Sequence, residues 1–137
     1  MNEDNLIKYY NKFNEDKRLN SRHGIVEFTT AIKYIEEILS NIENPKIIDV
    51  GCGTGKYSIY LKNMGYNVTA VELVKHNLMT LKKKDSSIKS YLGNAKDLSR
   101  FDDNSYDMVL LFGPMYHLIS MKDKLKALKE AKRIVKE

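Results

Sequence analysis

Three glycines at alternate positions, placed directly after a short apolar run, are the strongest chemical signal in the sequence. The run Ile47-Ile48-Asp49-Val50 leads into Gly51-Cys52-Gly53-Thr54-Gly55, and a second apolar run, 67–71, ends in the carboxylate of Glu72. Glycine allows a backbone to approach a ligand closely, and an acid that ends the second strand can accept hydrogen bonds from ribose hydroxyls. This layout predicts a mononucleotide-binding βαβ unit.

The spacing of the glycines separates this loop from two better-known nucleotide motifs. A P-loop needs Gly-x-x-x-x-Gly-Lys-Ser/Thr, whereas Lys56 directly follows Gly55 and Tyr57 comes next. The dinucleotide fingerprint needs its third glycine one residue later than Gly55. A nicotinamide-dependent oxidoreductase is therefore an alternative with the same architecture that the early third glycine disfavours.

The spacing of apolar residues predicts the strands and helices that position this loop. Strands are expected at 46–50, 67–71, 88–92 and 106–112, and helices at 5–19, 25–42, 57–64, 74–84 and from about 121 onward. Strands that alternate with helices favour a parallel sheet with helices on both faces. We therefore predict an α/β, Rossmann-like doubly wound sheet of order 3-2-1-4, with the ligand at the carboxyl ends of the first and fourth strands.

The last two predicted elements raise a question about the edge of the sheet. The fourth strand reads as a central strand buried on both faces, yet the predicted order leaves it at an edge. We therefore expect a sheet truncated before a fifth strand, or an edge that another partner covers, self-association included.

The last helix, capped by Ser120, is expected to bury the stripe Met121, Leu125, Leu128, Ala131 and Val135.

Composition sets the remaining bounds. A chain of 137 residues is one domain at most, divided here into an N-terminal helical cap at 1–45 and the sheet-forming part at 46–137. The net charge of +5 comes from lysines interspersed with acids, which favours a solvated surface and keeps RNA as an alternative partner. The single cysteine excludes an internal disulfide and, with no membrane span expected, indicates a cytoplasmic protein.

Four segments in order resemble the class I S-adenosylmethionine-dependent methyltransferases. Asp49-Val50-Gly51-Cys52-Gly53-Thr54-Gly55 resembles motif I of that family, and Val71-Glu72-Leu73 resembles its acidic post-I motif. The segment 93–98 is similar to the part that meets adenine, and 106–118 is similar to motif IV of small bacterial methyltransferase-like proteins. The resemblance spans roughly residues 8–137 and implies the N-terminal part of such a domain, with S-adenosylmethionine as cofactor.

The resemblance also implies a role for each matching residue. In the family, Asp49 lies beside the cofactor ammonium, Glu72 accepts from both ribose hydroxyls, and Leu73 packs on adenine. Asn94 stands where an Asp usually meets the adenine amine, and it can equally be a plain turn residue. The cofactor-binding residues implied are Asp49, Gly51, Cys52, Gly53, Glu72, Leu73, Asn94, Ala95 and Phe112.

Other reactive side chains give weaker signals. Cys52 has no base placed beside it, so a small loop residue is favoured over a nucleophile. His23, His76 and His117 lack metal-ligand spacing, and no metal is expected. His117 and Tyr116 are the candidates for catalysis, with packing or surface roles as the alternative. Tyr9, Tyr10 and Phe13 are expected to pack, or to form a cofactor lid that includes Arg18.

The resemblance predicts an enzyme that transfers a methyl group. An in-line displacement at a sulfonium methyl needs alignment more than acid–base groups, so the lack of a catalytic signature is consistent with it. Gly113-Pro114-Met115-Tyr116 lacks the Asn/Asp-Pro-Pro-Tyr/Phe pattern associated with methylation of planar nitrogens, which favours a small-molecule acceptor. The alternatives are an RNA methyltransferase and a nucleoside-binding module without transfer activity.

Overall fold

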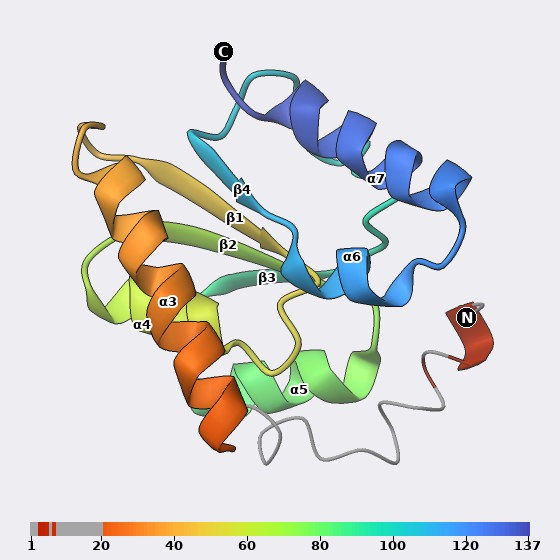
Figure 1. Cartoon of the computed structure of the whole chain (residues 1–137), viewed down its shortest axis with the longest axis horizontal. Coiled ribbons are helices and arrows are strands. Elements are labelled where there is room, and N and C mark those ends of the chain that lie inside the picture. The colour runs from red at the N-terminus through yellow and green to blue at the C-terminus, as the bar shows by residue number, and fades with distance from the viewer. Residues whose placement is uncertain (1–2, 6, 8–20) are drawn as a thin grey trace.

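A computed structural model describes residues 3–5, 7 and 21–137 of the chain, which form a parallel sheet with helices on both faces (Figure 1). The predicted helix at 5–19, with its aromatic residues and Arg18, falls almost wholly outside the described residues. No helix in the described part is long and apolar enough to cross a membrane. The strands are β1 (Lys46–Val50), β2 (Asn67–Glu72), β3 (Lys89–Leu92) and β4 (Met108–Leu110). The helices are α3 (Arg22–Leu39), α4 (Lys56–Asn63), α5 (Lys75–Lys84), α6 (Phe112–His117) and α7 (Met121–Ile134).

The order of the sheet is β3-β2-β1-β4, and all three pairings are parallel. This confirms the predicted doubly wound α/β fold. Parallel neighbours require crossover connections, which α4 provides between β1 and β2, and α5 between β2 and β3. Gly65 lies two residues after the last residue of α4, and its φ of +96° and its N–H bond to the Lys62 carbonyl are typical of a C-terminal helix cap.

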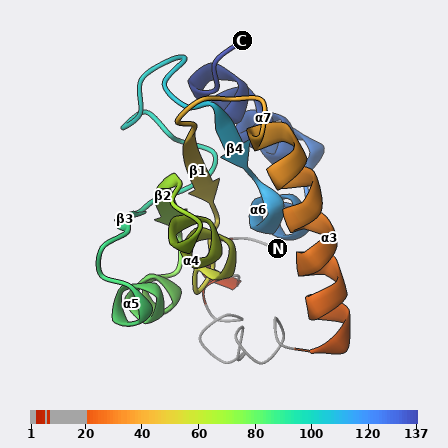
Figure 2. The ribbon, with the colours of Figure 1, turned by 90° about the vertical axis from the view of Figure 1, so that its left-hand side faces the viewer.

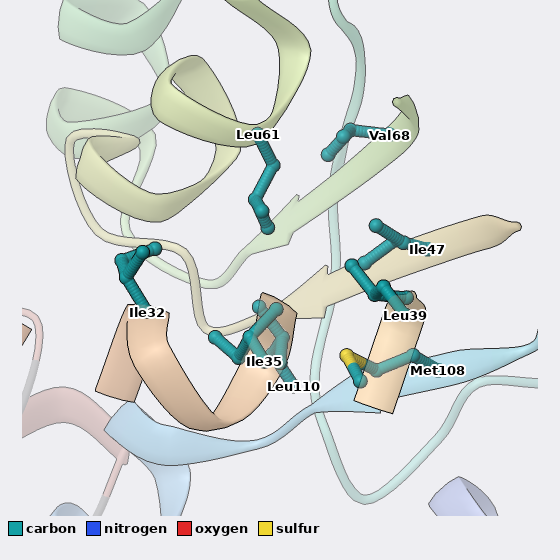
Figure 3. Packing of buried hydrophobic residues seen from close by; sticks show 8 residues of the cluster. All are labelled: Ile32, Ile35, Leu39, Ile47, Leu61, Val68, Met108 and Leu110. Carbon is teal, nitrogen blue, oxygen red and sulfur yellow. The ribbon is translucent and has the colours of Figure 1, made fainter. Parts of the chain in front are cut away.

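Strand alternation divides the core into two layers. On one face, Ile47 of β1, Val68 of β2 and Met108 of β4 pack against Ile35 of α3 and Leu61 of α4 (Figure 3). On this same face, α5 packs over the β2–β3 side and α3 over the β1–β4 side (Figure 2). The opposite face is covered by α7. Its cluster contains Ile48, Val50, Val71, Ala95, Leu98, Tyr106, Ala127 and Ile134.

The side of α7 that faces the sheet differs from the prediction. Ala127 and Ile134 are fully buried, whereas Met121, Leu125 and Leu128 of the predicted stripe are 69%, 49% and 45% exposed. The expectation of burial is therefore wrong for these three residues, whereas Ala131 and Val135 are partly buried. The side of α7 that faces the sheet also carries polar residues that are partly buried. The sequence therefore shows no continuous apolar stripe on that side.

The fourth strand is shorter than the apolar run that predicted it. The ladder with β1 covers only Met108–Leu110, and α6 begins at Phe112, where a continued strand was expected. Pro114 is the third residue of α6, and proline is tolerated in the first turn of a helix because that N–H needs no intrahelical partner. The helix turns the chain across the carboxyl end of β1.

The outer edge of β4 is partly paired. Tyr106 donates its N–H to the Ile134 carbonyl at 3.0 Å and accepts from the Lys136 N–H at 2.8 Å, which forms a parallel bridge between Tyr106 and Val135. The residues that follow α7 therefore begin to run beside the strand. In a parallel ladder alternate residues bond the same neighbour, so the outward groups of β4 after Tyr106 are those of Met108 and Leu110.

Candidate functional site

Two buried carboxyl groups lie at the carboxyl ends of the central strands. Asp49 of β1 is 3% exposed and Glu72 of β2 is 5% exposed. Asp49 pairs with Ala70, which lies two residues before Glu72, and residues two apart on a strand share a face. Both side chains therefore point to the sheet face that α4 and α5 cover.

Asp49 is held by the first turns of α4. Ser58 donates its Oγ–H to Oδ2 of Asp49 at 2.7 Å, and the serine is itself fully buried. Burial raises the pKa of Asp49 to about 6; the bond from Ser58 lowers it, and the charge of Glu72 raises it further. No ion pair found among the described residues involves Asp49. The site therefore holds a buried acid that, within this part of the chain, no cation neutralises.

The glycine loop connects β1 to α4 through left-handed backbone. Gly51, Gly53 and Gly55 have φ values of +76°, +60° and +92°. A Cβ at Gly51 would lie 2.4 Å from Cδ of Pro114, and one at Gly55 would lie 2.2 Å from Cδ1 of Leu81. Glycine is thus required at both positions by backbone conformation and by the packing of α6 and α5.

Glu72 reaches directly into this loop. Its Oε1 accepts from the Gly53 N–H at 3.2 Å, and its Oε2 accepts from the Val74 N–H at 2.9 Å and from Nδ2 of Asn77 at 3.3 Å. The structure therefore brings together the two features on which the sequence argument depends, the triple-glycine turn and the strand-end acid.

Sequence reasoning did not single out Ser58 and Asn77, the two buried polar partners of these acids. Asn77 is 2% exposed on α5, and Ser58 is fully buried on α4. A signal was present in both cases. Asn77 lies three residues after Val74 and four before Leu81, so it occupies the apolar stripe of its helix, and Ser58 lies three residues before Leu61 in the same way. Polar residues at such positions are buried with a partner.

The segment predicted to meet adenine follows β3, next to Glu72. The Gly93 N–H donates to the Glu72 carbonyl at 2.9 Å. Asn94 forms a turn, because its Oδ1 accepts from the Lys96 N–H at 3.0 Å, and its Nδ2 donates to Glu3 at 3.1 Å. Ala95 is 9% exposed within the α7-side core, and Leu73 is partly buried. The turn role that the sequence left open for Asn94 is thus present in the structure.

A charged clamp fixes the loop between β3 and β4 against α7. Arg133 donates to the carbonyls of Leu98 and Phe101 at 2.9 Å each and to Asp103 at 2.8 Å, and it also pairs with Glu130. These hydrogen bonds raise the pKa of Arg133 above its already high value. The clamp joins α7 to the loop that begins at the segment predicted to meet adenine. Glu130 and Arg133 lie on a face of α7 that has no apolar pattern in the sequence.

The residues after β4 border the glycine loop. A Cβ at Gly113 would lie 2.8 Å from the Gly51 carbonyl oxygen, so the start of α6 touches the loop directly. Phe112 is 39% exposed and lies 5.1 Å, centroid to centroid, from Tyr57 of α4. Tyr116 is 75% exposed, and His117 is partly buried at the end of α6.

Cys52 is unsuited to act as a nucleophile. It is 8% exposed, and burial, together with the nearby charge of Asp49, raises the pKa of its thiol well above the ordinary value. A thiol with a raised pKa stays protonated at neutral pH, and the thiolate is the reactive form. In the part of the chain that the structure describes, no group of three or more histidine, cysteine and acidic side chains is arranged to hold a metal ion.

Comparison with known proteins identifies the family of this fold and loop. The model of the methyltransferase domain matches residues 48–137. The chain belongs to the methyltransferase-domain family. Its glycine loop, strand-end acid and β4–α6 segment are therefore parts of a class I methyltransferase fold, and S-adenosylmethionine is the cofactor of that family.

Individual relatives agree with this assignment. A ubiquinone biosynthesis O-methyltransferase of Rickettsia typhi is 29% identical over 115 residues, which cover 80% of this chain and 46% of that protein. An S-adenosylmethionine-dependent methyltransferase structure from Methanosarcina mazei is 26% identical with a TM-score of 0.66, covering 72% of this chain and 52% of that one. A Pyrococcus horikoshii structure is 25% identical with a TM-score of 0.71, covering 94% and 61%. This chain thus spans about half the length of the curated relatives that it matches.

Proposed function

We propose that the methyltransferase domain binds S-adenosylmethionine at the carboxyl ends of β1 and β2 and transfers its methyl group to a small molecule. The observation that carries the proposal is the contact between Glu72 and the Gly53 N–H, which joins the strand-end acid to the glycine loop. A cofactor with an ammonium and a sulfonium also suits a site whose acid, Asp49, is buried beside a second carboxyl group.

Each matching residue then has a task in binding. Glu72 accepts the ribose hydroxyls in charge-assisted hydrogen bonds, and Asp49 faces the ammonium. Leu73, Asn94 and Ala95 border the adenine, and Phe112 borders the transferred methyl group. Gly51, Cys52 and Gly53 supply the backbone along the methionine part of the cofactor.

The chemistry needs alignment more than proton transfer. When bound, S-adenosylmethionine supplies an electrophilic methyl group on a positively charged sulfur. The protein's contribution is to hold that group in line with the acceptor and to exclude water, and such positioning can lower a barrier by several kcal/mol, on the order of 7 in well-oriented cases. Tyr116 and His117 stand on α6, beside this site, and are the candidates to contact the acceptor.

Calorimetry with S-adenosylhomocysteine tests the cofactor site. We expect the wild-type chain to bind and Glu72→Ala to bind about tenfold to a hundredfold more weakly, since it loses charge-assisted hydrogen bonds worth about 1.5–3 kcal/mol. Glu72→Gln keeps the shape and is expected to fall in between. Glu37→Ala, an exposed acid on α3, is the matched control and should bind as the wild type does. Absent wild-type binding, or binding that Glu72→Ala leaves unchanged, contradicts the proposal.

A small-molecule acceptor is supported by the exposed aromatic side chains of α6 and by the Rickettsia typhi relative, which is named a ubiquinone biosynthesis O-methyltransferase. The net charge of +5 supports RNA as the second candidate. Radiolabelled methyl groups, followed in cell extract after addition of the intact protein, separate the two. We expect label in small metabolites; label confined to RNA would favour the second candidate, and binding of cofactor without any labelled product would favour a nucleoside-binding module.

Two further properties belong to the proposal. The free thiol of Cys52 supports a reducing, cytoplasmic location. The outward backbone groups of Met108 and Leu110 support self-association through the β4 edge. Light scattering after gel filtration tests the latter, and a monomer at high concentration would contradict it.

A further inference from the structure

Asp49 accepts a hydrogen bond from a residue outside the four segments that resemble the family. Ser58 lies in the first turn of α4, and its Oγ is 2.7 Å from Oδ2 of Asp49. The Ser58 backbone also lowers the pKa of the same carboxyl group. Both residues are buried, so water cannot replace the bond from the hydroxyl.

The fold fixes Ser58 in this place. Gly55 immediately precedes α4 and adopts a φ of +92°, which lets the helix start directly after the glycine loop. Its open side is filled by Leu81 of α5, so the start of the helix cannot move toward α5. The third residue of α4 is thereby brought against the carboxyl end of β1.

The other neighbours of Asp49 do not stabilise its charge. Leu110 of β4 and Ala70 of β2 lie beside it in the sheet and are apolar. The charged group that acts on it is Glu72 at the end of β2, which opposes a second negative charge, and the nearby Cys52 thiol has a raised pKa and stays neutral. α3 contributes apolar side chains to this face of the sheet. Among the described residues, Ser58 is therefore the group that favours the ionised carboxylate.

We propose that Ser58 is a positioning residue for the cofactor: its hydroxyl orients the Asp49 carboxylate and keeps it ionised, so that it can face the cationic methionine end. The inference rests on the proposed function, in which Asp49 meets the ammonium. It predicts that cofactor affinity depends on pH through Asp49 and that Ser58 sets the pH at which this happens.

The test compares Ser58→Ala, Ser58→Thr and the control Ser105→Ala, whose hydroxyl bonds the Asp102 carbonyl far along the chain. Calorimetry with S-adenosylhomocysteine is run from pH 5 to pH 9. In the wild type, affinity should fall as the pH drops through about 6, the pKa that Asp49 has in the folded protein. In Ser58→Ala the midpoint should move upward by about one unit or more, because a hydrogen bond to a charged group is lost.

The shape of the pH profile separates positioning from general damage. Ser58→Ala should bind several-fold more weakly at pH 7 and regain most of its affinity at pH 9, where Asp49 is ionised without help. Ser58→Thr keeps the hydroxyl and should restore the wild-type midpoint. A loss of affinity that is equal at all pH values, or a midpoint that does not move, overturns the inference.

A second measurement keeps this inference distinct from the proposed function. Carbon-13 NMR of the side-chain carboxyl groups follows the titration of Asp49 in the absence of any ligand. If the titration midpoint of Asp49 is higher in Ser58→Ala than in the wild type, Ser58 keeps the carboxylate ionised. An unchanged midpoint overturns the inference. If the wild type binds no S-adenosylhomocysteine at any pH, the proposed function fails, and the NMR titration still decides whether Ser58 controls the charge of Asp49.

Discussion

Replacing Asp49 by asparagine should stabilise the fold while it weakens the site. The pKa of Asp49 rises from 3.8 to about 6 because the carboxyl group is buried. Asp49 binds a proton more tightly in the folded protein than in the unfolded chain. The stability that this protonation contributes is fully present below pH 3.8 and is lost as the pH rises through 6. A shift of about two units corresponds to about 3 kcal/mol at neutral pH.

Asparagine has nearly the shape of the protonated acid and can still accept from Ser58. We therefore expect Asp49→Asn to raise the free energy of unfolding at pH 8 by about 1–3 kcal/mol, the lower values allowing for the buried amide N–H groups. The advantage should shrink as the pH falls from 6 to 4 and should vanish below the unfolded pKa. Binding of S-adenosylhomocysteine should fall in the same variant, because the negative charge is gone.

Urea denaturation followed by circular dichroism measures the effect, since the chain has no tryptophan for fluorescence. Wild type and Asp49→Asn are compared at pH 8, 6 and 4, with equal m-values as the check for two-state unfolding. A variant that is less stable than the wild type at pH 8, or a difference that is the same at all three pH values, would refute the reasoning from burial.

Three further groups of substitutions test other parts of the structure. Gly55→Ala should cost about 3 kcal/mol of unfolding free energy, because its Cβ overlaps a leucine side chain of α5 and its φ is positive, whereas Gly65→Ala, with nothing within 4 Å, should cost about 1 kcal/mol; urea denaturation compares the two. Arg133→Ala should cost about 2 kcal/mol and speed amide hydrogen exchange in the β3–β4 loop, and Arg133→Lys should not restore protection because it lacks the fork of donors; unchanged exchange would contradict the clamp. Asn77→Asp places a carboxylate against Glu72 and should destabilise the fold by about 3 kcal/mol at pH 8 and by much less at pH 4, so an equal loss at both pH values would argue against charge repulsion.

Most secondary structure could be predicted because local patterns agree with the fold. The strand at Lys46–Val50 begins and ends as predicted, and the Ser120 cap forms as expected. The end of β4 could not be predicted. A continuous apolar run carries no sign of where a strand stops, and the turn into α6 depends on the contact of Gly113 and Pro114 with the glycine loop.

The sequence also could not predict which side of α7 faces the sheet. Periodicity identifies an apolar side of a helix but not the surface that it meets. The sheet receives the side with Ala127 and Ile134, whose neighbours Glu130 and Arg133 form a clamp with the β3–β4 loop. A polar pair that is satisfied by tertiary contacts looks like a solvated surface in the sequence.

By itself, the sequence determined the class of fold, the strand order and the position of the nucleotide loop, because strand periodicity, glycine spacing and parallel connections are local properties with few solutions. Only the tertiary structure decided that Asp49 and Glu72 share a buried face, that Ser58 and Asn77 are their partners, and that α6 closes over Gly51. These contacts depend on which face of each helix meets the sheet and on how tightly the helix packs there. Neither property can be derived from the spacing of residues along one segment.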